Sequence, residues 1–164
     1  FRNARIVREI AAREDVPVVA GCNRPMVRPP MLASEFHGAT GLGDYPAFEP
    51  HANADDLHAV NFIIDTLRAS DEPIVVLMTG PLTNLAMALR LAPDISANIR
   101  EIVVMGGARL EGGNITASAE YNIYADPHAA QIVLEAGRPV ALFGLDATHQ
   151  VRATQTRIAA REAV

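Results

Sequence analysis

The stretch IVVLMTGPLTNLAMALRL, residues 74–91, contains the strand–turn–helix unit on which the predicted fold rests. Its first seven residues are almost all apolar and do not alternate with polar ones, which is typical of a strand in a parallel sheet covered on both faces. Gly80-Pro81 predicts a turn. Residues 82–91 then predict a helix that ends before Pro93, because proline cannot continue a helix.

The same unit recurs along the chain, at roughly 30–40 residue spacing. We expect further strands over 16–21, 101–107 and 139–144, and further helices over 2–13, from 53–56, over 128–136 and from about 152. Alternation of strand and helix is the pattern of parallel sheets with right-handed crossovers. The predicted fold class is therefore α/β, an open and mostly parallel sheet with helices on both faces, in one domain over residues 1–164.

Composition and charge place the chain among ordinary globular proteins. Its 164 residues are 49% hydrophobic and 20% charged, with a net charge of −5. No Lys/Arg block stands out, so neither a nucleic-acid partner nor a membrane is predicted. Cys22, the single cysteine, excludes an internal disulfide and fits a cytoplasmic protein. We interpret Cys22 as a small apolar residue after a strand.

Polar side chains gather in the segment GGARLEGGNITASAEYNIYADP, residues 106–127, which follows a predicted strand. In open parallel sheets, ligands bind outside the carboxyl ends of the strands. We therefore interpret this segment as a binding loop, with Thr79–Gly80 and Gly144–His149 beside it. Asn114, Glu120 and Asn122 offer amide and carboxylate groups that suit a polyhydroxyl ligand such as a sugar, and also a hard cation.

Other polar residues leave alternatives open. Glu111, Glu120 and Asp146 either include an acid–base pair or are solvated loop acids. His37 either donates a proton or contacts a base, while His149 is a core or capping histidine. Neither a phosphate-binding glycine motif nor a zinc-ligand spacing is present.

Several motifs together resemble the nucleoside hydrolase family, the inosine–uridine preferring enzymes and their relatives. The similar segments are TGPLTNLAMALRLAPDI, EIVVMGG, GNITASAEYNIYADPHAAQIVLEAG and VALFGLDATHQV, with HGATGLG earlier in the chain. They cover about residues 16–151 in the family's order. The resemblance implies an open α/β fold, hydrolysis of ribonucleosides to ribose and free base, and one calcium ion that holds the ribose hydroxyls.

The resemblance also implies roles for single residues. Thr79 matches a threonine whose backbone carbonyl binds calcium. Met105 lines the ribose pocket, Asn114 and Glu120 grip the ribose 5′ hydroxyl, Asn122 lies at the ribose hydroxyls near the metal, and His37 lies near the base. Tyr121 stands where the family usually has phenylalanine.

Two family motifs are absent from the chain: the amino-terminal cluster Asp-x-Asp-x-Gly-x-Asp-Asp, and a later His-Asp pair. The first supplies the catalytic base and most metal carboxylates. We therefore expect a central fragment of a calcium-dependent ribonucleoside hydrolase, homo-oligomeric in its parent protein, with no catalytic residue of its own and inactive alone. The alternative is a non-catalytic chain that binds a nucleoside or sugar.

Overall fold

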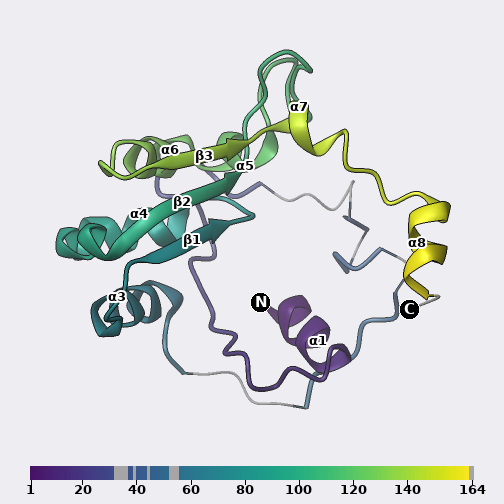
Figure 1. Ribbon diagram of the computed structural model, residues 1–164, viewed down its shortest axis with the longest axis horizontal. Helices are drawn as coiled ribbons and strands as arrows, with labels where there is room; N and C mark the ends of the chain where they lie inside the picture. The colour runs from purple at the N-terminus through teal and green to yellow at the C-terminus, as the bar shows by residue number, and fades with distance from the viewer. Residues whose placement is uncertain (32–36, 39, 44, 52–55, 163–164) are drawn as a thin grey trace.

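The computed structural model describes residues 1–31, 37–38, 40–43, 45–51 and 56–162 of the chain. Its centre is a parallel sheet of three strands in the order β1 (Ile74–Met78), β2 (Ile99–Met105) and β3 (Val140–Phe143). Figure 1 shows the three strands side by side with helices along them. The predicted parallel α/β sheet is confirmed.

The helices alternate with the strands as the sequence predicts. Before β1 come α1 (Arg2–Ile10) and α3 (Ala59–Ala69). Between β1 and β2 lie α4 (Thr83–Leu91) and the 3-10 helix η1 (Pro93–Asn98), and between β2 and β3 lie α5 (Tyr121–Ala125) and α6 (Pro127–Leu134). After β3 come α7 (Leu145–Thr148) and α8 (Gln155–Glu162). None of the helices in the described ranges has the length and apolar character needed to cross a bilayer.

The core lies between one face of the sheet and a layer made of α3, α4 and α6. In β2, Ile102 and Val104 are fully buried, whereas Val103 between them is only half-buried. This alternation shows that every second side chain faces the helices. The buried apolar partners come from all three helices and from η1: Val60, Ile64, Leu67, Leu82, Leu85, Leu89, Ile95, Ala129 and Val133.

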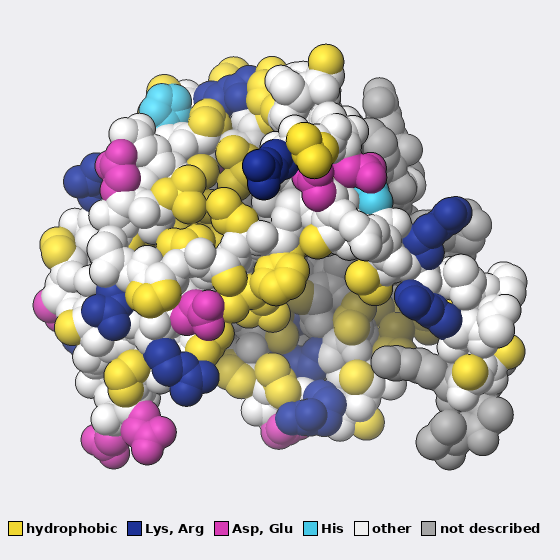
Figure 2. Space-filling view, turned by 45° about the horizontal axis from the view of Figure 1, so that its top comes forward, with side chains coloured by type: hydrophobic (Ala, Val, Ile, Leu, Met, Phe, Trp, Pro, Cys, Tyr) yellow, Lys and Arg dark blue, Asp and Glu magenta, His cyan; other side chains and the backbone are white. Residues whose placement is uncertain are grey.

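The opposite face of the sheet is more exposed. Leu77 in β1 pairs with Val103 of β2, so both point away from the buried Ile102 and Val104. Leu77 is 65% exposed, and Phe143 at the end of β3 is 51% exposed. Hydrophobic side chains also gather across the middle of the surface shown in Figure 2, with charged side chains around them.

Two predicted elements differ from the structure. Over residues 16–21 the expected strand is reduced to an isolated bridge at Val19. Pro17 has no N–H to donate, and the Ala20 carbonyl accepts the N–H of Ala59 at 2.7 Å, so neither group joins a sheet ladder. The predicted helix start falls partly on residues 53–55, outside the described residues. The structure begins α3 at Ala59, where the His58 side chain accepts the N–H of Val60.

Smaller differences concern element ends. Residues 106–127 are not one long loop, because α5 begins at Tyr121. Helix α1 ends at Ile10 rather than 13, and Ala12 adopts a positive φ of 50°. The short helix α7 was not predicted, since four residues carry too little periodicity to show.

The segment 21–31 runs along the amino ends of α4 and α6 and is bound there by side chains. The Cys22 N–H donates to Asn84 Oδ1 at 2.8 Å, and Cys22 packs against the core as predicted for a small apolar residue. Burial raises the pKa of its thiol. The Arg28 guanidinium donates to the Tyr124 carbonyl at 2.6 Å and lies 4.0 Å from the centre of the Tyr124 ring.

Asp126 is the fully buried centre of these contacts. Its carboxylate accepts the Met26 N–H at 2.9 Å, the Thr83 hydroxyl at 2.6 Å and the Ala129 N–H at 3.1 Å. A buried carboxylate is tolerated when donors satisfy it. Asp126 therefore joins segment 21–31, α4 and α6 at one point.

We predict that Asp126→Ala lowers the free energy of unfolding by about 3 kcal/mol or more, because several buried donors lose their acceptor. Asp94→Ala is the matched control, since Asp94 is an exposed acid whose side chain pairs, among the described residues, with Arg68. Denaturant unfolding of both variants makes the comparison. Equal midpoints in the two variants would contradict the role given to Asp126.

Candidate active site

Three groups predicted from separate segments meet at the carboxyl ends of β1 and β2. The Asn122 side chain, on α5, donates through Nδ2 to the Met105 carbonyl at 3.0 Å. The same Nδ2 lies 3.5 Å from the Thr79 carbonyl and 3.3 Å from the Met105 sulfur. Asn122 is 8% exposed and thus bridges the ends of two neighbouring strands. This is the edge of a parallel sheet where ligands bind.

Glu120 lies next to this bridge as the residue that caps α5. Its carboxylate accepts the N–H groups of Asn122 at 3.0 Å, Ile123 at 3.3 Å and Gly107 at 3.0 Å. Glu120 is only 2% exposed. A carboxylate at the start of a helix is stabilised by the unpaired N–H groups there. The charge is therefore fixed in position beside the ends of β1 and β2.

Asn114 lies in the middle of the loop between β2 and α5 and is exposed. Its Oδ1 accepts the Tyr121 N–H at 2.8 Å, so Asn114 is tied to the residue between Glu120 and Asn122. The backbone around it is tight: a Cβ on Gly113 would lie 2.3 Å from Ala119 backbone atoms. The Tyr121 hydroxyl donates to the Met31 carbonyl at 2.7 Å, a contact that the usual phenylalanine could not make.

His37 is the one predicted site residue that the structure does not join to this group. It is exposed, its carbonyl accepts the Gly43 N–H at 2.9 Å, and its side chain makes no hydrogen bond with any described residue. The segments on either side of it lie partly outside the described residues. Its predicted place near the base thus remains a prediction.

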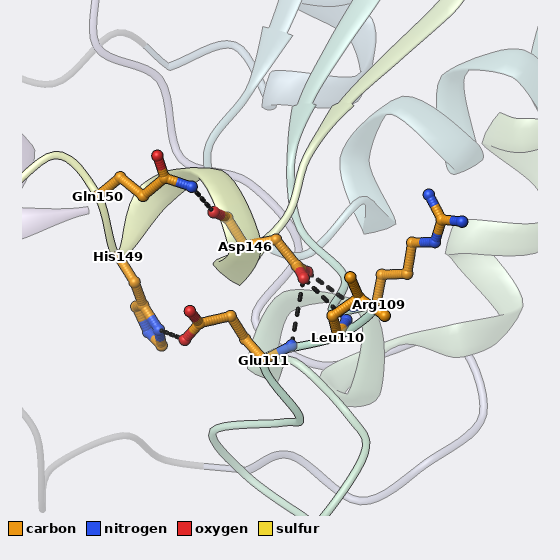
Figure 3. Close-up of polar contacts among 6 residues, drawn as sticks. All are labelled: Arg109, Leu110, Glu111, Asp146, His149 and Gln150. Atoms are coloured by element: carbon orange, nitrogen blue, oxygen red, sulfur yellow. Dashed lines mark hydrogen bonds and ion pairs between the residues drawn. The ribbon is translucent and has the colours of Figure 1, made fainter.

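Asp146 and Glu111 do not form an acid–base pair. Figure 3 shows the Asp146 carboxylate directed at the loop after β2, where it accepts the N–H groups of Arg109 and Leu110 at 2.8 Å and of Glu111 at 3.2 Å. These hydrogen bonds lower the pKa of Asp146, chiefly those from Leu110 and Arg109. Glu111 points the other way and contacts His149 Nδ1 at 2.8 Å. His149 is exposed and ends α7, so it is a capping rather than a core histidine.

The described residues do not by themselves make a calcium site. Calcium takes six to eight oxygen ligands, with carboxylates among them. In the ranges that the structure covers, no three His, Cys, Asp or Glu side chains lie together in a way that could hold a metal ion. Thr79 offers a single carbonyl, and the Glu120 carboxylate is already surrounded by backbone N–H groups.

The residue types alone did not predict the part that Gly107 and Asp126 play in and around the site. Gly107 acts through its backbone N–H, which every residue except proline carries. Asp126-Pro127 predicts a helix start, and this is confirmed, but the pattern does not reveal that the Asp126 carboxylate also holds Met26 and Thr83.

The arrangement suits a ligand with several hydroxyl groups that develops positive charge. Glu120 supplies a fixed negative charge, and the Thr79 and Met105 carbonyls are further acceptors at the same edge. Asn122 Oδ1 accepts no hydrogen bond from a described residue and remains an acceptor. Preorganised groups of this kind stabilise charge without reorganisation during a reaction.

Comparison with known proteins agrees with this geometry. The family model described as inosine-uridine preferring nucleoside hydrolase matches residues 1–164. An uncharacterised protein of Schizosaccharomyces pombe is 46% identical over 99% of this chain and 53% of its own length. A pyrimidine-specific ribonucleoside hydrolase, RihB of Shigella flexneri, is 50% identical over 92% of this chain and 48% of its own length.

Solved structures show the same fold. A purine-preferring ribonucleoside hydrolase from Gardnerella vaginalis superimposes with a TM-score of 0.86 and 37% identity, over 93% of this chain and 50% of that one. The chain thus spans about half the length of the relatives that it matches. On the family match over its whole length and on these relatives, the chain belongs to the inosine-uridine preferring nucleoside hydrolase family.

Proposed function

We propose that the protein takes part in hydrolysis of the N-glycosidic bond of ribonucleosides, giving ribose and free base. The observation that carries this proposal is the meeting of Glu120, Asn122 and the Thr79 and Met105 carbonyls at one edge of the sheet. Family membership supports the same reaction, and two relatives are named ribonucleoside hydrolases.

The reaction explains why a fixed carboxylate is needed. As the bond between the anomeric carbon and the base nitrogen breaks, its electron pair leaves with the base and positive charge develops on the ribose ring. We propose that Glu120 and Asn114 bind the ribose 5′ hydroxyl and ease that charge. We further propose that Asn122 accepts a hydrogen bond from a ribose hydroxyl, that Met105 lines the sugar pocket and that His37 lies near the base.

Water supplies the hydroxyl that ends on the anomeric carbon, and its proton must be taken by a base. At this edge of the sheet, the carboxylate of Glu120 accepts the N–H groups of Gly107, Asn122 and Ile123, and the carboxylate of Asp146 accepts those of residues 109–111. We therefore assign no catalytic base to residues 1–164.

We also propose that the protein uses calcium, with the Thr79 carbonyl as the one ligand from these residues. Carbonyl oxygen is a ligand type that calcium accepts. Because the described residues offer no carboxylate cluster, we derive no step of the reaction through the ion. We further propose that residues 1–164 form part of one α/β domain of a cytoplasmic homo-oligomer, without a nucleic-acid or membrane partner.

A second candidate is a chain that binds a nucleoside or sugar without hydrolysing it. The observation that favours it is the same: the groups proposed to face the ribose are assembled, whereas the two described carboxylates at this edge of the sheet, those of Glu120 and Asp146, are already bound by backbone N–H groups. Ribose release separates the two functions, because a binding protein would show affinity for ribonucleosides without turnover.

We predict that Glu120→Gln and Asn122→Ala each lower kcat/KM for ribonucleosides by about 10²–10³-fold, roughly 2.7–4 kcal/mol of transition-state stabilisation. Ribose release is measured with purine and pyrimidine ribonucleosides, in this chain or, if it does not turn over, in a longer protein that contains it. Gln131→Ala, on the exposed side of α6, is the control. A variant with unchanged kcat/KM would remove that residue from the site.

We predict that a chelator abolishes ribose release and that added calcium restores it. If the chain alone binds ribonucleoside without releasing ribose in either condition, the binding function is favoured over the hydrolase. Turnover that persists in chelator would contradict the calcium proposal.

A further inference from the structure

Asp146 makes an unusual set of contacts for a partly exposed acid near a strand end. Its two carboxylate oxygens accept three successive backbone N–H groups, those of Arg109, Leu110 and Glu111 (Figure 3). The side chain comes from α7, after β3, whereas the loop that it holds follows β2. One carboxylate thus joins the segments after two neighbouring strands. Hydrogen bonds to a charged acceptor are about twice as strong as neutral ones.

The same two segments are joined again immediately beside the strands. The Leu145 N–H donates to the Gly107 carbonyl at 2.9 Å, and the Gly106 N–H donates to the Phe143 carbonyl at 3.2 Å. They also lie very close together, since a Cβ on Gly144 would be 2.8 Å from the Gly107 carbonyl oxygen. The position of Gly107 is therefore set from the β3–α7 side.

Gly107 connects this junction to the proposed ribose site. Its N–H donates to Glu120 Oε2 at 3.0 Å, and Glu120 also accepts the N–H of Asn122. Asp146 is therefore linked to the Glu120 carboxylate through its hydrogen bonds to residues 109–111, the backbone that joins these residues to Gly107, and the hydrogen bond of the Gly107 N–H.

We propose that Asp146 is a positioning residue for ribonucleoside hydrolysis, which holds the segment after β2 so that the Gly107 N–H keeps the Glu120 carboxylate aligned with the ribose. This inference rests on the proposed function and adds a residue that does not touch the substrate. Misplacing a catalytic group by about 1 Å can cost on the order of 10²-fold in rate, so an indirect contact can be important.

The test compares Asp146→Ala, Asp146→Asn and a matched control, Glu111→Gln. The control weakens the exposed contact with His149 but leaves all three N–H groups bound to Asp146. We expect Asp146→Ala to lower kcat about 10- to 100-fold with little change in KM. Asp146→Asn should lie in between, because the amide retains one acceptor oxygen, and the control should match the unsubstituted protein.

Hydrogen exchange of the Gly107 amide provides a readout that does not need activity. We expect faster exchange at Gly107 in Asp146→Ala than in Glu111→Gln. A purely structural role for Asp146 would lower the amount of folded protein and leave the kcat and KM of the folded fraction unchanged, which would overturn the inference. Unchanged Gly107 exchange would overturn it as well.

The two levels of proposal fail in different ways. If neither this chain nor a longer protein that contains it releases ribose from any ribonucleoside, the proposed function fails, and Gly107 exchange alone then decides whether Asp146 holds the loop. If ribose is released and Asp146→Ala leaves kcat unchanged, the proposed function stands and the inference fails.

Discussion

The buried carboxylate of Glu120 is the constraint to which the rest of the site is adapted. A charge withdrawn from water has to be met by donors, or it costs several kcal/mol. Here the donors are backbone N–H groups from the start of α5 and from Gly107. Because these groups belong to two segments, the carboxylate can be satisfied only when the loop after β2 returns to the end of its own strand.

The return of that loop in turn brings Asn122 to the strand ends. Asn122 lies two residues after Glu120, within the first turn of α5. The hydrogen bonds that position Glu120 as the N-cap therefore also position the side-chain amide of Asn122. The amide then binds the carbonyls that terminate β1 and β2. Parallel strands place such carbonyls at one edge of the sheet, which is why a short helix can reach both.

Asp126, which follows α5, is a second buried carboxylate that caps a helix and binds other segments of the chain. It is a fully buried carboxylate that caps α6 and also binds Met26 and Thr83. Segment 21–31 is therefore attached to the helices that carry the site, and Tyr121 adds a further contact to Met31. Glu120 and Asp126, two buried acids six residues apart, thus position the segments around the strand ends. The apolar core between the sheet and its helices holds the strands and helices themselves in place.

The sequence by itself determined most of the elements and named candidate residues for the site, because apolar periodicity, capping residues and the family motifs are local properties of the chain. It predicted β1, β2, β3, α4 and α6 closely. Hydrogen bonds join its candidates Thr79, Met105 and Asn122, and place Asn114 and Glu120 beside them, while their roles stay predictions. The sequence was wrong on the strand over 16–21, and it left open whether Glu111, Glu120 and Asp146 include an acid–base pair. Only the tertiary structure decided which donors each carboxylate meets, since those donors are mostly backbone N–H groups that no side-chain pattern marks. From the sequence, Asp146 could not be distinguished from a solvated loop acid. The structure shows its carboxylate bound to three successive backbone N–H groups.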